Sequence, residues 1–280
     1  MLIDYIVWNI RPEIFILPDN FPLIGGFSVR WYGLLFAMSF IFGYLIIQKM
    51  FKKEGIPIKV LDDLSTYMII STIVGARLGH CLFYEPSYFF AHPIDILKIW
   101  EGGLASHGAA VGILVGLYIF AKRNHKHYLW VLDRTSVVIA LAGFFIRTGN
   151  LMNSEIFGDV TTMPWGMVFV RVFGEGYPIA HHPTQLYEAI GYLFLFIFLY
   201  RYYWKHDGAP AEGAIFGYFL LILWPLRLLI EFIKLPQVEF ENTMFLNMGQ
   251  LLSIPLIIIG AYFLWRSKKQ IKLYSKKTQL

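Results

Sequence analysis

Charge is scarce in this 280-residue sequence: Asp, Glu, Lys and Arg together make up 15% of it, while 57% of the residues are hydrophobic. Soluble domains contain about 25% charged and roughly 45–50% apolar residues. The composition therefore excludes a soluble globular protein as well as a disordered or fibrous chain. An apolar surplus of this size indicates that a lipid bilayer surrounds most of the chain.

Cysteine is equally scarce, since Cys81 is the only one in the sequence. A single thiol cannot form an internal disulfide, and no pair of cysteines is spaced to bind zinc. The first 20 residues include Asp4, Arg11 and Glu13 and lack a basic region followed by an apolar run. They are therefore not expected to form a cleavable signal peptide.

Long apolar runs are abundant. A helix needs about 20 mostly apolar residues to cross a membrane, and seven runs near this length occur, at residues 32–48, 62–84, 102–121, 129–146, 185–203, 213–233 and 248–265. We predict an all-α polytopic membrane protein with about seven transmembrane helices, in a single integral membrane domain over residues 1–280. Residues 150–184 are too polar and too rich in glycine and proline to span, so we expect a small folded segment outside the bilayer.

The basic residues predict how these helices are oriented. Fifteen of the 24 Lys and Arg residues lie in four regions, namely the loops after the first, third and fifth predicted helices and a basic tail at residues 266–280. These regions share one side of the membrane if the helices alternate in direction. The positive-inside rule then places the tail in the cytoplasm, and the N-terminus and residues 150–184 on the outer side. Because topology accounts for the excess positive charge, no nucleic-acid partner is expected.

Topology does not explain four arginines that lie within or at the edge of predicted helices: Arg30, Arg77, Arg147 and Arg227. A charged side chain at membrane depth costs at least about 2.5–3.5 kcal/mol on insertion scales, so it marks a candidate functional site. Arg227 and Glu231 lie one helical turn apart and can form an ion pair. The pair is either a structural link between helices or an anion site in which Glu231 orients the guanidinium.

The densest polar cluster, RTGNLMNSEIFG, starts at Arg147, at the outward end of the fourth predicted helix. Arg147 presents a planar fork that suits phosphate. Asn150 and Asn153 can donate and accept hydrogen bonds, and Gly158 permits backbone conformations closed to other residues. A helix C-cap followed by a polar loop explains the glycines and one asparagine, but not the whole set together with Glu155. The cluster therefore predicts a binding turn for an anionic group.

Two further residues each have two interpretations. His107, flanked by glycine, alanine and serine, is either a hydrogen-bonded packing residue or a proton acceptor, since histidine titrates near neutral pH. Tyr32, at the outward start of the first helix, is either an interfacial anchor or part of a site. His182 adds a polar group just before the fifth helix. Together with Arg147 and Arg227, these residues predict one polar cavity near the outer leaflet.

A transporter or channel for an anionic solute is the competing interpretation, because arginines facing a polar cavity also describe anion pathways. Such a conduit needs polar residues in both halves of the bilayer. The inward halves of the first, third and fifth helices are almost entirely apolar, as residues 194–200 illustrate. One-sided polarity favours a lipid-modifying enzyme. A structural subunit that only binds lipid would not need so many convergent ionisable groups.

These motifs, taken together and in order, resemble the prolipoprotein diacylglyceryl transferases of bacterial inner membranes. The resemblance extends from about residue 29 to residue 255 and is carried by VRWYG (29–33), GGLASHG (102–108), RTGNLMNSE (147–155) with Gly158, HPTQLYE (182–188), Arg227 with Glu231, and MGQ (248–250). One of these motifs alone would be weak, whereas the ordered set is specific.

The resemblance implies transfer of the sn-1,2-diacylglyceryl group of phosphatidylglycerol to the lipobox cysteine of a preprolipoprotein, with release of glycerol phosphate, in the bacterial inner membrane. The nucleophile belongs to the protein substrate, and no cofactor or metal is expected. Catalysis is expected to involve Arg147, His107, Arg227, Tyr32 and Glu155. His107 is the first candidate for the base, although it can instead hold lipid or pack helices, and Glu155 is either an alternative base or an orienting partner of Arg147. The expected phosphatidylglycerol-binding residues are Arg147, Asn150, Asn153, Gly158, Arg227, Glu231 and His182.

Overall fold

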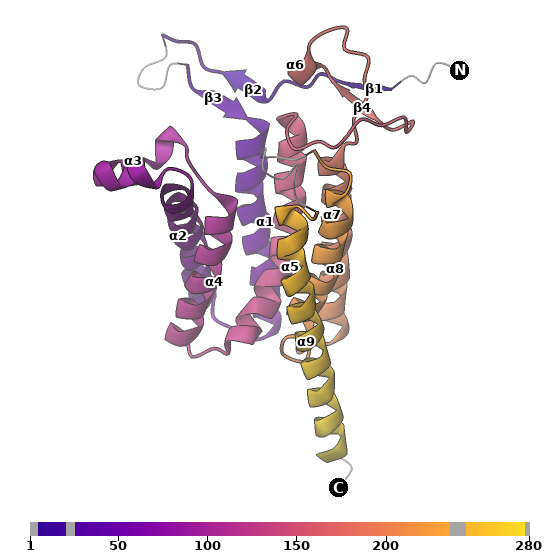
Figure 1. The fold of residues 1–280 in the computed structure, drawn as a ribbon. Helices are drawn as coiled ribbons and strands as arrows, with labels where there is room; N and C mark the ends of the chain where they lie inside the picture. The colour runs from indigo at the N-terminus through magenta and orange to yellow at the C-terminus, as the bar shows by residue number, and fades with distance from the viewer. Residues whose placement is uncertain (1–4, 21–25, 236–244, 278–280) are drawn as a thin grey trace. The chain divides into compact units, whose positions relative to one another are not determined.

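The computed structural model describes residues 5–20, 26–235 and 245–277 (Figure 1). The helices within these ranges are α1 (Trp31–Lys53), α2 (Ile58–Phe83), α3 (Pro86–Ala91), α4 (Ser106–Arg123), α5 (Tyr128–Met152), α6 (Val170–Phe173), α7 (Thr184–Lys205), α8 (Ala214–Glu231) and α9 (Met248–Lys277). Two 3-10 helices, η1 (Pro93–Leu97) and η2 (Ile99–Glu101), follow α3.

Every one of the seven apolar runs coincides with a long helix, namely α1, α2, α4, α5, α7, α8 or α9. Five of the described helices are long and apolar enough to cross a membrane: α1, α2, α5, α8 and the Met248–Gln270 part of α9. The chain is thus a helical polytopic membrane protein. The number seven stays a prediction, because α4 and α7 are not among these five.

Two predicted boundaries differ from the structure. Helix α5 continues to Met152, so the segment between α5 and α7 begins at residue 153 rather than 150. Helix α9 continues to Lys277 through most of the predicted tail at residues 266–280, whose last three residues lie outside the described part. Residues 266–277 contain no glycine or proline and are rich in lysine, so nothing in them ends a helix.

Short strands, which the sequence did not predict, precede α1 and interrupt the segment before α7. Strand β1 (Ile6–Trp8) pairs in parallel with β4 (Met167–Phe169), and β2 (Glu13–Ile16) pairs antiparallel with β3 (Ser28–Arg30). Leu151, Met167 and Phe169 form a small core under Trp8, whose indole donates to the Leu151 carbonyl at 3.0 Å. The segment that was expected outside the bilayer is therefore folded.

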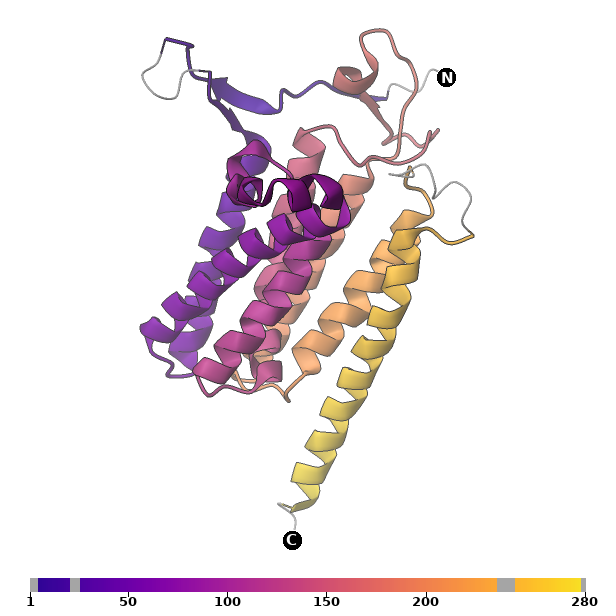
Figure 2. The ribbon, with the colours of Figure 1, turned by 60° about the vertical axis from the view of Figure 1, so that its left-hand side comes forward.

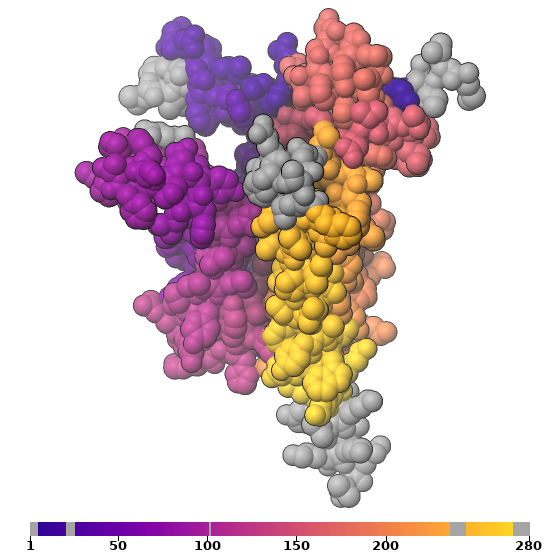
Figure 3. Space-filling model, viewed as in Figure 1, coloured from indigo at the N-terminus to yellow at the C-terminus, as the bar shows by residue number. Residues whose placement is uncertain are grey.

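The chain divides into two compact units, residues 1–45 with 135–280, and residues 46–134. In the first unit, α8 and α9 run side by side (Figure 1). Glycines bring these two helices close: a Cβ placed on Gly217 would lie 2.9 Å from the Leu264 nitrogen, and one on Gly260 would lie 2.8 Å from Leu220 Cβ. Figure 3 shows side chains of α9 along its visible face, and those of Ile258, Tyr262 and Trp265 are more than half exposed, as a lipid-facing surface requires.

In the second unit, α2 and α4 lie side by side over much of their length (Figure 2). Glycines at a spacing of four residues face each other across this seam, Gly75 and Gly79 on α2 and Gly108 and Gly112 on α4. A Cβ on Gly79 would lie 2.5 Å from the Gly108 Cα, and one on Gly112 would lie 2.8 Å from the Gly75 Cα. Small residues at this spacing let helix backbones touch where lipid removes the hydrophobic driving force for association.

Arg77, one of the four arginines left unexplained by topology, has a structural role in this unit. Its guanidinium is buried and donates to the carbonyls of Ile96 at 2.9 Å and Gly102 at 2.7 Å, and also to that of Asp95. Phe89 covers it with the ring centroid 4.9 Å away. One cation thus satisfies the irregular backbone between α2 and α4.

The α2–α4 seam generates a prediction for Gly112→Val. The added side chain has no room against the Gly75 backbone, so the variant should lose about 1–3 kcal/mol of stability, as overpacked sites do. Thermal unfolding of the purified protein in detergent measures this as a lower midpoint. Ala110→Val, at an exposed position of the same helix, is the control and should leave the midpoint unchanged. Equal midpoints for the two variants would contradict backbone contact at the seam.

Candidate functional site

A cluster of buried charges lies within the first unit, where α5, α7 and α8 contribute side chains. Arg147 Nε of α5 lies 2.8 Å from Glu188 Oε2 of α7. Lys234, three residues beyond the end of α8, places its Nζ 3.7 Å from Glu188 Oε1 and 3.7 Å from Glu231 Oε2. The Glu188 and Lys234 side chains are 0% and 1% exposed. Charges withdrawn from solvent to this degree must be paired, so the cluster fixes the three elements relative to one another.

Side chains of α5 and α7 hold the Arg147 guanidinium. Its Nε faces Glu188, and its Nη1 donates to Asn150 Oδ1 at 3.2 Å. A side-chain hydrogen bond also joins Arg147 to Tyr192 of α7. The guanidinium is therefore fixed in orientation, as a planar group that recognises phosphate must be.

Glu155 belongs to the network that holds Arg147. Its Oε1 accepts from Asn150 Nδ2 at 2.7 Å and from Asn153 Nδ2 at 3.2 Å. Asn150 thus bridges Arg147 to Glu155. The structure brings these four predicted residues together and gives Glu155 the contacts of an orienting partner.

The turn after α5 is strained. Ser154 and Ile156 have φ values of 55° and 63°, a conformation that costs roughly 1–3 kcal/mol for residues other than glycine. The first turn of α7 holds it in place: Thr184 Oγ1 donates to the Ile156 carbonyl at 2.8 Å, and Gln185 Nε2 donates to the Glu155 carbonyl at 2.6 Å. Strain maintained by buried partners is typical of a functional site.

Gly158 ends this turn at a point of close backbone approach. A Cβ at this position would lie 2.7 Å from Thr184 Cγ2 and 2.9 Å from His182 Cβ, and would also collide with the Ile233 carbonyl. Gly158 forms an isolated bridge with Lys234. The predicted binding glycine thus has a packing role, since it lets the turn lie against the strand-like stretch that carries Lys234.

The expected pair between Arg227 and Glu231 is absent from the ion pairs of the described residues. Glu231 approaches Lys234 instead, and Arg227 Nε is buried without a hydrogen-bond partner there. The Arg227 guanidinium carbon lies 5.7 Å from the Trp224 ring centroid. A lysine three residues further on thus takes the carboxylate and leaves the arginine available.

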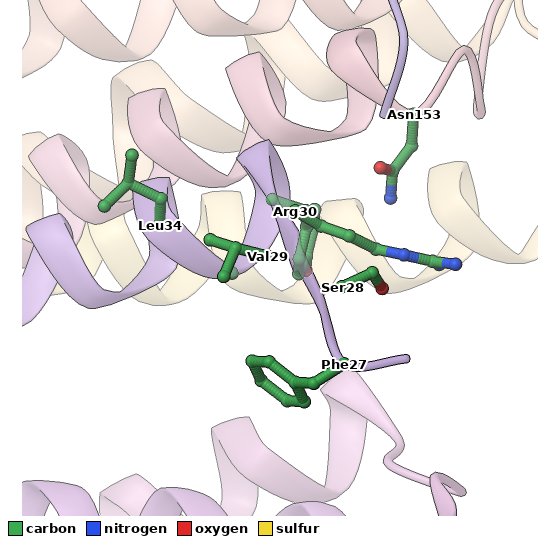
Figure 4. Close-up of a pocket in the computed structure, with 8 residues that line it drawn as sticks. Phe27, Ser28, Val29, Arg30, Leu34 and Asn153 are labelled. Atoms are coloured by element: carbon green, nitrogen blue, oxygen red, sulfur yellow. The ribbon is translucent and has the colours of Figure 1, made fainter. Parts of the chain in front are cut away.

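Tyr32 lines a pocket of about 450 Å³ together with Phe27, Ser28, Val29, Arg30, Gly33, Leu34 and Asn153. The polar ends of Arg30 and Asn153 extend to one side of this pocket, and Val29 and Leu34 lie on the other (Figure 4). Tyr32 also packs on α5, since a Cβ on Gly149 would lie 2.8 Å from its Cδ2. A pocket with one polar and one apolar side suits an amphipathic molecule.

The two predicted histidines have contacts of their own. His182 Nδ1 is 3.1 Å from the Tyr187 hydroxyl, which accepts from Trp165 Nε1 at 2.8 Å. His107 is an exposed residue in the first turn of α4 and belongs to the second unit. Within the described part of the chain, its side chain has no hydrogen bond or ion pair.

Comparison with known proteins identifies the protein family. The family model "Prolipoprotein diacylglyceryl transferase" matches residues 18–266. The chain belongs to this family. A phosphatidylglycerol–prolipoprotein diacylglyceryl transferase of Tolumonas auensis is 42% identical over 264 residues, which cover 94% of this chain and 98% of the relative. Proteins of the same name from Chloroherpeton thalassium and Porphyromonas gingivalis are 42% and 43% identical and cover 96% and 95% of this chain and 97% and 95% of their own length.

Two residues of the charge cluster, Glu188 and Lys234, were not predicted from the sequence as site residues. Glu188 lies in the HPTQLYE motif, and its available signal was its place three residues after Gln185, on the same face of the predicted helix. Lys234 belongs to none of the four basic regions that set the orientation, and it follows Glu231 by three residues. A basic residue outside the regions that set the orientation was the available signal for Lys234.

Gly158→Ala should damage the site through packing alone. A methyl group here must displace the Ile233 carbonyl or the His182–Thr184 backbone, so we expect a loss of about 1–3 kcal/mol and a lower thermal midpoint in detergent. Gly43→Ala is the matched control in the same unit, because its Cβ would meet Val138 Cβ at an ordinary 3.7 Å. If Gly158→Ala unfolds at the temperature of Gly43→Ala, the close approach is not a constraint.

Proposed function

We propose that this protein transfers the sn-1,2-diacylglyceryl group of phosphatidylglycerol to the thiol of the lipobox cysteine of a preprolipoprotein, which is the first step of bacterial lipoprotein maturation. The products are a thioether-linked lipoprotein precursor and glycerol phosphate. The observation that carries the proposal is the buried cation cluster of a family member, in which Glu188 and Asn150 fix the Arg147 guanidinium and Arg227 Nε has no hydrogen-bond partner among the described residues.

The chemistry needs such a cluster. A thiolate attacks the glycerol carbon next to the phosphodiester, a C–S bond forms, and the C–O bond to phosphate breaks with its electron pair remaining on the phosphate oxygen. The leaving group gains a negative charge as this happens. Arg147 and Arg227 are the cations that we assign to that phosphate, because charge that develops in the transition state is best stabilised by donors already in place. Asn150, Asn153, Glu231 and Gly158 are assigned to supporting them.

Tyr32 and His182 complete the assignment of the binding residues. Tyr32 lines the amphipathic pocket, and its hydroxyl is assigned to a phosphoglycerol oxygen. His182 is assigned to the edge of the site, where it contacts Tyr187.

The thiol proton needs an acceptor, and His107 is our candidate. Glu155, the alternative, already accepts hydrogen bonds from Asn150 and Asn153, so it fits an orienting role better. The exposed His107 imidazole is free to accept a proton from an incoming thiol.

We also propose that the N-terminus and residues 150–184 face the periplasm of the inner membrane, with the basic residues 266–280 in the cytoplasm, in one integral domain. The support is the uneven distribution of lysine and arginine. Because Cys81 is buried, single cysteines introduced at Lys205 and Asp159 can be tested with a membrane-impermeant thiol reagent on intact cells. Labelling of the Lys205 site but not the Asp159 site would reverse the orientation.

The test of the activity is incubation of the purified protein with phosphatidylglycerol and a lipobox peptide, with the peptide mass as readout. We expect a diacylglyceryl adduct on the cysteine. Absence of the adduct, together with anion flux across liposomes, would return the assignment to a transporter, which the family comparison does not support.

Arg147→Lys should fail as severely as Arg147→Ala in this assay. A lysine keeps the charge but cannot face Glu188 with one edge and a phosphate with the other. We expect both variants to lose at least about 100-fold in rate, since transition-state donors are typically worth that much. A lysine variant with wild-type activity would refute the clamp.

His107→Gln should lower the transfer rate by about 10²–10⁴-fold, the usual contribution of a general base. The loss should shrink as pH rises, because a thiol that is already ionised needs no base. Rates measured from pH 6 to 9 with the same peptide give this profile. Near-normal transfer at neutral pH would remove His107 from the chemistry.

A further inference from the structure

Lys234 is buried, although it belongs to none of the motifs found in the sequence. Its Nζ is 3.7 Å from each of two carboxylates, Glu188 and Glu231, and it has no hydrogen-bond partner within the described residues. The backbone fixes this position, because the Asp159 nitrogen donates to the Ile233 carbonyl at 2.9 Å and Gly158 bridges to Lys234. An ammonium held between two carboxylates neutralises both without being drawn fully to either.

The alternative pairing of these charges shows what Lys234 prevents. Glu231 lies one helical turn from Arg227, the spacing at which the two side chains meet on a helix. Glu188 already contacts Arg147 Nε, and its second oxygen faces Lys234. Without the ammonium, each carboxylate would depend on a guanidinium for its counter-charge, and the donors needed for an anionic ligand would be used within the protein.

We infer that Lys234 is a positioning residue for the phosphate site: its ammonium pairs with Glu188 and Glu231 and thereby leaves Arg147 and Arg227 free to bind the phosphate of the lipid. The inference rests on the proposed function, because it assigns the anion to the phosphatidylglycerol headgroup and to the glycerol phosphate product. Lys234 need not touch either of them.

The charge count supports this role. Arg147, Arg227 and Lys234 carry three positive charges, and Glu188 and Glu231 carry two negative ones, so the five groups sum to +1. Removing the lysine charge brings the sum to zero, and the buried site then has no net attraction for an anion. Glu155 is left out of the sum because it is bonded to Asn150 and Asn153 rather than to Lys234, and its charge is the same in every variant compared.

The charge of Lys234 depends on pH. Burial lowers the pKa of Lys234, and Arg147 of α5 and Arg227 of α8 lower it further, while Glu188 of α7 and Glu231 of α8 raise it. Its proton is therefore lost at a lower pH than that of an exposed lysine. As pH rises through this lowered pKa, the carboxylates are released and phosphate binding should weaken. Arginine at this position would stay charged throughout the same range.

The experiment measures two quantities in detergent micelles, the KM for phosphatidylglycerol and the inhibition constant of glycerol phosphate. The variants are Lys234→Met, Lys234→Arg and the double variant Lys234→Met with Glu188→Gln. Lys205→Met, which changes an exposed lysine at the end of α7, is the matched control. Elution as a single species on size exclusion checks that each variant is folded.

We expect Lys234→Met to raise both constants at least tenfold, with a smaller effect on kcat, and Lys205→Met to change neither. The double variant should recover most of the affinity, because it restores the sum of +1 and glutamine can still accept from Arg147. Lys234→Arg should bind like wild type at neutral pH and should lose the weakening of affinity that wild type shows at alkaline pH. If Lys234 had only a structural role, Lys234→Arg would leave the loss of affinity at alkaline pH unchanged.

Three results would overturn the inference: wild-type constants for Lys234→Met, a double variant no better than the single one, or an alkaline limb unchanged in Lys234→Arg. If Lys234→Met does not fold, the pH profile of Lys234→Arg decides alone. Wild-type protein that forms no adduct with phosphatidylglycerol would instead refute the proposed function, and with it the inference. An active wild type with an indifferent Lys234 refutes only the inference.

Discussion

The burial of the Glu188 carboxylate is the constraint on which the rest of the site depends. An ionised carboxylate without solvent is strongly destabilising unless cations surround it, and removing one partner from such a pair typically costs about 3–5 kcal/mol. Arg147 from α5 and Lys234 from beyond α8 meet this demand from two other elements. One side chain on α7 therefore determines where the ends of three elements must lie, which is more than apolar packing in lipid could specify.

The strained turn follows from the same constraint. Arg147 must reach Glu188 from the last turns of α5, and the chain must then reverse sharply to bring Gly158 against the stretch that carries Lys234. Ser154 and Ile156 take up this reversal in left-handed conformations, and Thr184 and Gln185 secure it from the same helix that carries Glu188. The contacts that fold this turn thus also hold Arg147. Its guanidinium is oriented before any ligand binds, and donors already in place stabilise developing charge best.

Much of this architecture could be predicted from the sequence, and what could not has physical reasons. Apolar runs located all seven long helices, because a spanning helix leaves a signal along its whole length. The RTGNLMNSE motif identified Arg147, Asn150 and Glu155 as neighbours, since they are close in sequence. The partner of Arg147 was beyond reach, because Glu188 is distant from it in the chain. Glu231 has two basic residues at helical spacing, Arg227 and Lys234, and spacing alone does not choose between them. The strands β1 and β4 are three residues each, too short for an alternating pattern to register.

The glycine seam between α2 and α4 also limits how a lipid can move. An acyl chain that enters a helical protein sideways needs two neighbouring helices to separate by about the width of a methylene chain, and side-chain rotation usually provides part of that gap. At Gly75, Gly79, Gly108 and Gly112 there are no side chains to rotate, and backbone touches backbone. This seam can open only if the whole helices α2 and α4 move apart. An acyl chain therefore cannot enter between them, and any lateral passage for substrate or product must run between other helices.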